Sequence, residues 1–269
     1  MSTTGILIAL GLTIFAGLST GIGGLIVLLF KKPNPKALSV SLGLSAGVMV
    51  YISFVELLSE SNKQLVADYG TGTGGWLSLA AFFGGIFLIA IIDNLIPIQE
   101  NPHEYSGSEG LDYSGLKGDQ RLFRVGVFTA LIIAIHNFPE GMATFISAIQ
   151  DPSLGIAVAI AVAIHNVPEG ISVAIPVYSA TGSRMKALGW SIISGLGEPL
   201  GAVIAYLIIM PILSDALFGI LYAVIAGIMV YISFDELLPT AREYGEHHLT
   251  IYGLIAGMII MAVSLQLLM

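Results

Sequence analysis

Long runs of apolar residues follow one another along this chain, separated by short polar segments. A helix needs about 20 apolar residues to cross the hydrocarbon core of a bilayer. Eight runs reach that length, so the pattern predicts an all-α polytopic membrane protein in which one transmembrane domain fills residues 1–269. The eight predicted transmembrane helices are Gly5–Phe30, Ala37–Leu58, Gly75–Ile96, Leu122–Ile149, Leu154–Tyr178, Ala187–Met210, Asp215–Leu238 and Leu249–Leu268.

The basic residues fall on one side of these helices. The connections are mostly short, and the longest is the polar segment Gln99–Arg121 between the third and fourth helices. Of the ten Lys and Arg residues, only Lys63 falls on the opposite side. Loops rich in Lys and Arg stay in the cytoplasm. We therefore expect a multi-pass protein of the cell membrane with a cytoplasmic loop at Gln99–Arg121 and both termini extracytoplasmic.

The composition agrees with this interpretation and narrows the chemistry. Hydrophobic residues make up 55% of the chain and charged residues only 10%, with a mean hydropathy of +0.89, whereas soluble domains carry about 25% charged residues. The net charge of −8 disfavours nucleic acid as a partner. Because the chain has no cysteine, disulfides and thiolate metal sites are excluded.

Residues 47–58 (GVMVYISFVELL) return almost unchanged as residues 227–238 (GIMVYISFDELL). Ten of the twelve positions are identical. One copy lies in the second predicted helix and the other in the seventh, which cross the membrane in opposite directions. Inverted repeats are typical of alternating-access transporters. They predict a 3+2+3 arrangement, in which the last three helices repeat the first three by inversion around a central pair.

The repeat also places acidic residues at the two mouths of the predicted bundle. Glu56 ends its copy at the outer end of the second helix, and its counterpart Glu236 lies at the inner end of the seventh. Asp93 and Asp235 add negative charge at the inner mouth. Clustered negative charge concentrates cations, so these four residues are candidates for cation entrance and exit. The alternative is that they are simply solvated at helix ends.

A second repeat lies in the central pair of helices. The segment HNFPEG at residues 136–141 returns as HNVPEG at residues 165–170, each copy in the middle of an apolar run. Because residues i and i+4 share a helix face, His136 should project beside Glu140, and His165 beside Glu169. Imidazoles and carboxylates bind divalent metals. Carboxylates at membrane depth are costly and mark function.

The prolines and glycines of this motif predict irregular, closely packed helices. Pro139 and Pro168 cannot donate backbone hydrogen bonds, so each helix should kink and expose a carbonyl oxygen. Gly141 and Gly170 should allow neighbouring helices to approach closely.

Glu198 is the other acid deep within a predicted helix, and Pro199 follows it. An unpaired carboxylate in lipid would cost several kcal/mol, so Glu198 should face the same cavity. We therefore predict a binuclear midplane centre that fits Zn²⁺ and would accept Fe²⁺, Mn²⁺, Co²⁺ or Cd²⁺. Metal binding should displace protons, so transport should depend on pH. The predicted ligands are His136, Glu140, His165 and Glu169 for one ion and Asn137, Asn166 and Glu198 for the second, with Glu140 and Glu169 bridging.

The paired HNxPEG segments, the eight spans and Glu198 resemble the ZIP (Zrt-/Irt-like protein) family of divalent metal transporters over essentially the whole chain. The compact size and a histidine in both motifs are most similar to its bacterial ZupT-type zinc transporters. The resemblance implies uptake toward the cytoplasm with zinc favoured, a binuclear centre at the positions above and a homodimer. It also implies an elevator-like motion of helices 1, 4, 5 and 6 past helices 2, 3, 7 and 8. Asn166 stands where some members have Asp, which removes one charge from the second site.

Three other functions share some of these features. An intramembrane zinc hydrolase would use His and Glu ligands, but the H-E-x-x-H motif is absent from the sequence, and inversion symmetry has no catalytic purpose. A metal exporter of the cation-diffusion type usually has six spans and a soluble metal-binding domain. A membrane metal sensor would bind metal without moving it, and the sequence leaves that alternative open. We expect a transporter rather than an enzyme, with metal as cargo and no prosthetic group.

Overall fold

The structure, a computed structural model, describes residues 3–29, 35–95, 118–212, 214–244 and 247–268, and these residues are almost entirely helical. The predicted loop Gln99–Arg121 therefore lies largely outside the described residues. The elements are α1 (Thr3–Leu29), α2 (Pro35–Ile52), η1 (Ser53–Leu57), α3 (Leu58–Leu95), α4 (Gly118–Gln150), α5 (Pro152–Thr181), α6 (Arg184–Gly195), α7 (Gly197–Ile204), η2 (Ala205–Ile209), η3 (Met210–Ile212), α8 (Asp215–Ile232), η4 (Ser233–Leu237), α9 (Leu238–Tyr244) and α10 (His247–Leu268).

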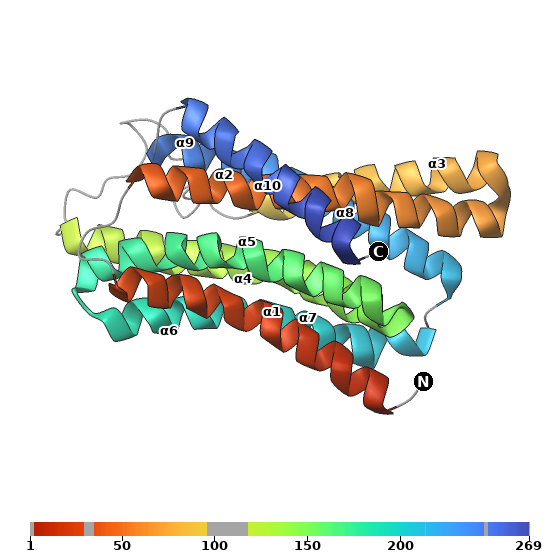
Figure 1. The fold of residues 1–269 in the computed structure, drawn as a ribbon, viewed down its shortest axis with the longest axis horizontal. Coiled ribbons are helices and arrows are strands. Elements are labelled where there is room, and N and C mark those ends of the chain that lie inside the picture. Colours follow the sequence, from red (N-terminus) through yellow and green to blue (C-terminus); the bar gives the residue numbers. More distant parts are fainter. Residues whose placement is uncertain (1–2, 30–34, 96–117, 213, 245–246, 269) are drawn as a thin grey trace.

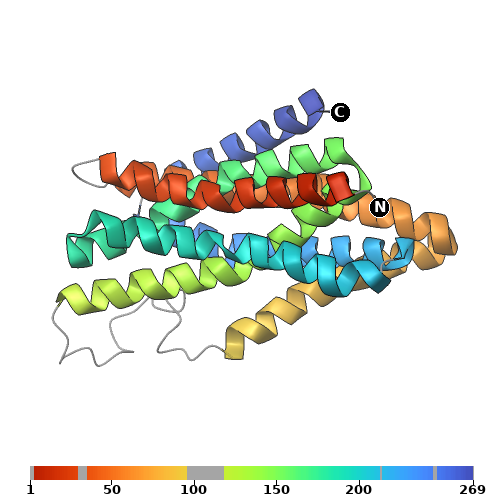
Figure 2. The same ribbon diagram turned by 90° about the horizontal axis from the view of Figure 1, so that it is seen from below.

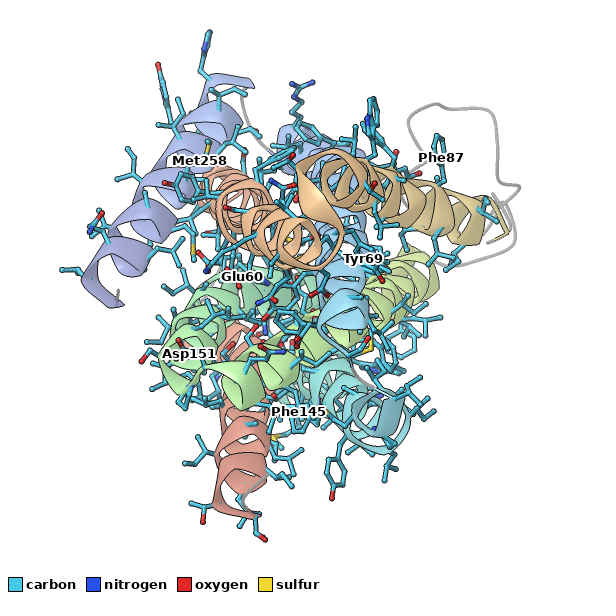
Figure 3. The ribbon with its side chains drawn as sticks, turned by 90° about the vertical axis from the view of Figure 1, so that its right-hand side faces the viewer. Glu60, Tyr69, Phe87, Phe145, Asp151 and Met258 are labelled. Carbon is cyan, nitrogen blue, oxygen red and sulfur yellow. The ribbon has the colours of Figure 1, made fainter. Side chains whose placement is uncertain are left out.

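The surface of the bundle is apolar, as a membrane protein requires. Seven stretches of the described chain are long and apolar enough to cross a membrane. Phe87, Leu207 and Ile259 are 64%, 61% and 58% exposed. Figure 3 shows Phe87 at the periphery of the bundle. Continuous apolar surface of this kind is rare in soluble proteins, so the structure agrees with a polytopic membrane protein.

One of the seven stretches, Ser39–Asp93, is 55 residues long and reverses direction inside α3. Gly70 has φ 80° and ψ 164°, a conformation that essentially only glycine adopts. Ser61 Oγ lies 2.9 Å from Ser78 Oγ, although a straight helix would separate these residues by about 25 Å. The two arms of α3 therefore run antiparallel, and Figure 1 shows the turn at one end of the molecule.

This turn corrects one predicted boundary. The second helix was expected to end at Leu58, but helical structure continues through η1 into the first arm of α3. Ser61 and Leu65 are fully buried on that arm. The apolar run measures only the part of a helix that lipid can cover, whereas buried contacts extend the helix beyond it.

The helices form two layers (Figures 1 and 2). One layer contains α1 and α4 to α7, where α5 packs on both α1 and α4. The other contains α2, α3 and α8 to α10, where α3 packs on α8 and α2 on α10. The two layers meet where α2 contacts α5 and α8 contacts α4.

The repeat found in the sequence extends to the backbone. The five-residue π-helical turns η1 and η4 occupy equivalent positions of the two copies. Ser53 Oγ donates to Met49 O at 2.7 Å, and Ser233 Oγ donates to Met229 O at the same distance. A π-helical turn is often found at a functional site. Both turns carry a glutamate, Glu56 or Glu236, of which only 8% is exposed.

The sixth predicted helix, Ala187–Met210, is not continuous. It is divided into α6, α7 and the short turns η2 and η3, with the break at Leu196. Pro199 cannot donate a backbone hydrogen bond to Gly195, and the carbonyl of Gly195 instead lies against Gly17 of α1. The break places Glu198 in the first turn of α7.

Candidate metal centre

The two HNxPEG segments lie side by side on α4 and α5, and their ionisable side chains pair across the two helices. His165 Nε2 lies 3.1 Å from Glu140 Oε2, and His136 Nε2 lies 3.3 Å from Glu169 Oε1. The contact within α4, between His136 Nε2 and Glu140 Oε1, is longer at 3.9 Å. All four side chains are at most 2% exposed. The sequence correctly placed His136 and Glu140 on one face, but the shorter contacts join different helices.

The glycines of the motif bring two further helices against this pair, as predicted. A Cβ atom on Gly141 would lie 2.1 Å from the backbone carbonyl oxygen of Glu198 on α7. A Cβ atom on Gly170 would lie 1.8 Å from the backbone carbonyl oxygen of Thr20 on α1. Only glycine permits these approaches.

The predicted oxygen ligands gather on the side of the pair that faces α1, α6 and α7. Asn166 Nδ2 donates to Glu198 Oε1 and, at 2.9 Å, to the backbone oxygen of Ala16. Asn137 Nδ2 donates at 3.3 Å to the backbone oxygen of Ser194. Glu198 is fully buried, and its contact with Asn166 places it beside the second motif.

The seven predicted ligands share one further property. Each has at least one buried nitrogen or oxygen atom without a hydrogen-bond partner. Buried polar atoms are normally paired, so this set offers free lone pairs to a cation. Across the described residues, no three or more His, Asp or Glu side chains already converge around one point as metal ligands do. The donors are thus gathered but not arranged as a closed cage.

The separations within the cross-helix pairs nevertheless suit a metal ion. Two ligands on a tetrahedral zinc with bonds of about 2.05 Å lie about 3.3 Å apart. The His136–Glu169 and His165–Glu140 distances of 3.3 and 3.1 Å are close to that value.

The structure adds hydroxyl groups that sequence reasoning missed. Ser45 Oγ of α2 donates at 3.1 Å to Glu169 Oε1. Thr144 and Thr20 are fully buried, and their hydroxyls have no hydrogen-bond partner. Thr144 lies one turn beyond Glu140 on the same helix face, a spacing that could have identified it. Ser45 carries no such signal, because only the packing of α2 on α5 brings it to the centre.

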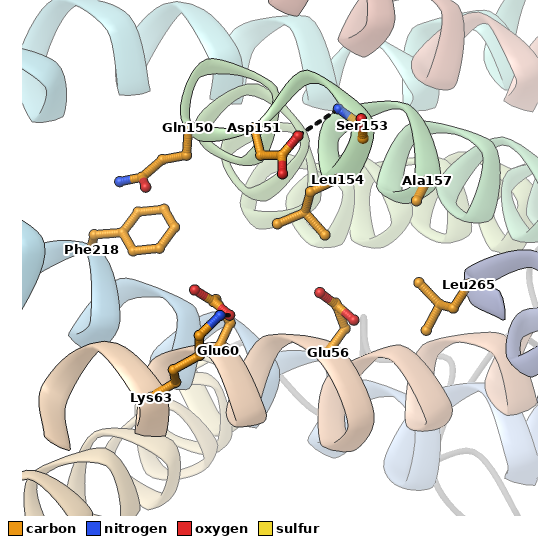
Figure 4. Close-up of a pocket in the computed structure, with 10 residues that line it drawn as sticks. All are labelled: Glu56, Glu60, Lys63, Gln150, Asp151, Ser153, Leu154, Ala157, Phe218 and Leu265. Atoms are coloured by element: carbon orange, nitrogen blue, oxygen red, sulfur yellow. Dashed lines mark hydrogen bonds and ion pairs between the residues drawn. The ribbon is translucent and has the colours of Figure 1, made fainter. Parts of the chain in front are cut away.

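The four candidate entrance and exit residues lie in three different surroundings. Glu236 Oε2 lies 3.6 Å from His136 Nδ1, so this residue lies beside the first motif. Asp93 and Asp235 instead lie beside Tyr231. Glu56, at the equivalent position of the other repeat copy, lines a separate cavity (Figure 4).

Comparison with known proteins identifies the family. The sequence profile described as ZIP Zinc transporter matches residues 99–265. The chain belongs to the ZIP family. It is 54% identical to the zinc transporter ZupT of Chlorobium chlorochromatii, covering 98% of this chain and 99% of that protein. It is 56% identical to the zinc transporters ZupT of Streptococcus mutans, over 95% and 96% of the two chains, and of Oceanobacillus iheyensis, over 97% and 98%.

Proposed function

We propose that this ZIP protein takes up divalent metal cations, with zinc favoured, through a midplane centre that opens alternately to the two sides of the cell membrane. The observation that carries this proposal is the crosswise pairing of His136 with Glu169 and of His165 with Glu140 in the buried interior. Relatives at more than 50% identity over nearly the whole chain are named zinc transporters.

The two layers of the bundle can account for transport if one moves relative to the other. The proposed arrangement has eight spans, the two arms of α3 counting separately, in a 3+2+3 inverted repeat with extracytoplasmic termini. α1 begins and α10 ends on the side of the bundle toward which α3 extends before it reverses (Figure 1). The centre is carried by the layer of α1 and α4 to α7, whereas Ser45 and Glu236 reach it from the other layer. An elevator-like shift of one layer past the other would move the centre between the two mouths, in a homodimer.

The centre would hold its cargo in a binuclear form. His136, Glu140, His165 and Glu169 supply nitrogen and oxygen donors that suit Zn²⁺ and also Fe²⁺, Mn²⁺, Co²⁺ or Cd²⁺. Asn137, Asn166 and Glu198 supply oxygen for a second ion, with the two motif glutamates bridging. Three carboxylates leave the charge of two divalent ions partly uncompensated, which favours release as well as binding.

Flux into liposomes tests this function. The purified protein would be reconstituted with a zinc-sensitive dye inside, beside His136→Ala, Glu140→Ala and the control His248→Ala, whose histidine is exposed on α10. We expect saturable zinc entry by the parent and the control, and none by the two centre variants. Zinc that is bound but never moved would refute transport and favour a sensor. Flux that survives both centre substitutions would refute the midplane site.

A further inference from the structure

A cavity of about 460 Å³ lies at the end of the molecule where α3 reverses and α4 is joined to α5. Glu56 and Glu60 come from η1 and the first arm of α3, and Gln150 and Asp151 come from the α4–α5 connection opposite. Figure 4 shows the two sets facing each other across the cavity, with Lys63 beside Glu60. The cavity thus lies between the two layers, at the mouth that the sequence predicts to be outer.

Glu56 is the unusual residue of this cavity. Its side chain points into the space (Figure 4), and only 8% of the residue is exposed. Among the described residues its carboxylate has no hydrogen bond or ion pair, and the charges of Lys63 and Glu60 act on it at longer range. A carboxylate on a largely buried residue is less screened by water than one on an open surface, so it attracts a cation in the cavity more strongly.

The other charges of the cavity already have partners of their own. Asp151 Oδ1 caps α5 by accepting from Ser153 N at 2.8 Å. Lys63 Nζ lies 3.2 Å from Glu60 Oε2, and the Lys63 side chain is 78% exposed. Three carboxylates against one ammonium leave the cavity with two net negative charges, the charge of one divalent cation.

The cavity is large enough for a hydrated ion. A water molecule takes about 30 Å³ in the liquid, so 460 Å³ holds about fifteen water molecules. A divalent ion with six waters fits without losing any of them. The carboxylates stand on opposite walls (Figure 4) and act on such an ion through its water shell. This differs from the midplane centre, where the donors are close enough to bind metal directly.

We propose that this cavity is a docking site for a hydrated divalent cation, anchored by Glu56 and assisted by Asp151, and that Lys63 weakens docking as a tethered competing cation. The proposal rests on the proposed transport function, because docking is useful only as the step before dehydration at the centre. Lys63 is the one basic residue that the sequence places on the outer side, and in this proposal it raises the metal concentration at which transport is half-maximal.

Two isosteric or near-isosteric substitutions with opposite expected effects test this site. Zinc flux would be measured against zinc concentration on the cavity side for Glu56→Gln, Lys63→Gln and the control Asp68→Asn, an exposed acid of the same arm outside the cavity. A carboxylate a few ångströms from a hydrated divalent ion changes its affinity by about threefold to tenfold. We expect a KM raised by about that factor in Glu56→Gln, a KM lowered about twofold to threefold in Lys63→Gln, and no change in Asp68→Asn, with maximal flux unchanged in all three.

Structural damage would act in one direction only, so a KM that rises in both cavity variants overturns the proposal. An unchanged KM in Glu56→Gln overturns it as well. If the parent transports zinc but the cavity substitutions leave KM unchanged, only the docking site is refuted. If the parent transports no zinc, the transport function itself is refuted.

A second measurement reads docking without flux. The chain has no cysteine, so Gln150→Cys places a single thiol on the cavity wall. We expect Mn²⁺, which binds thiols weakly, to slow modification of this thiol by a cationic methanethiosulfonate reagent. That protection should disappear when Glu56→Gln is added. No protection by Mn²⁺ with Glu56 intact would overturn the docking site whatever the flux shows.

Discussion

The contact between Gly170 and α1 gives a quantitative test of the packing around the centre. In Gly170→Ala, the new Cβ would lie 1.8 Å from Thr20 O and 2.8 Å from Thr20 C, both backbone atoms. Neither atom can rotate away, so α1 and α5 must separate by about 1 Å or more in an interior that is close-packed. Overpacking costs about 1–3 kcal/mol, and a clash with backbone belongs at the upper end of that range.

Gly84 is the matched control for this substitution. It also lies within a helix, on the second arm of α3, but a Cβ there would meet no atom within 4 Å. Replacing an unstrained helical glycine by alanine stabilises by about 0.5–1 kcal/mol. The two Gly→Ala changes should therefore have opposite signs and differ by about 3–4 kcal/mol.

Thermal unfolding of the purified protein in detergent measures this difference. We expect a lower Tm than the parent for Gly170→Ala and an equal or higher Tm for Gly84→Ala. Zinc flux should fall in Gly170→Ala, because Glu169 is the adjacent residue. A Gly170→Ala protein as stable as Gly84→Ala would show that α1 does not pack on α5 as described.

Two further predictions address the second metal site and the other layer. Glu198→Gln keeps the shape of a side chain that is hydrogen-bonded to Asn166 but removes its charge. Zinc bound at equilibrium should therefore fall from two ions per protein to one, while zinc flux continues at a lower rate. An unchanged stoichiometry would contradict the binuclear assignment. Ser39 Oγ and Thr250 Oγ1 lie 3.0 Å apart in the interior and join α2 to α10. Thr250→Val should therefore lower the free energy of unfolding by about 1 kcal/mol. Adding Ser39→Ala should lower it little further, which a double-mutant cycle measures.

The grouping of the candidate ligands could be predicted because the two motifs are local features of the sequence. HNxPEG places a histidine and a glutamate one turn apart, and its two copies lie in helices that must cross the same bilayer. Glu198 was identified because a carboxylate within a membrane helix costs free energy, so its presence there indicates a function. The structure places these residues together with the two motif asparagines in the buried interior.

The pairing within the centre could not be predicted in this way. Helical spacing favoured His136 with Glu140, whereas the shorter contact of His136 is with Glu169. Which carboxylate lies nearer depends on how far α4 and α5 slide along each other, and that is set by tertiary contacts such as Gly141 against α7. Ser45 joins the centre for the same reason.

Helix ends were the least predictable feature. A count of apolar residues finds only the part of a helix that lipid covers, so the second helix was predicted to end at Leu58. In the structure the helix continues toward Gly70, with Ser61 and Leu65 buried on the added turns. The span predicted over residues 187–210 lies within one apolar stretch of the structure, Arg184–Ile212, but its helix is interrupted at Leu196, where Pro199 leaves the carbonyl of Gly195 without its usual helical partner.

The two repeat glutamates show why symmetry in the sequence does not give symmetry in the structure. Glu56 and Glu236 occupy equivalent positions of equivalent π-helical turns and are equally buried. Yet Glu236 lies 3.6 Å from His136, while Glu56 faces an open cavity. A conformation in which only one of the two equivalent glutamates lies beside a motif histidine is consistent with the proposal that this protein exposes one site to the two sides in turn.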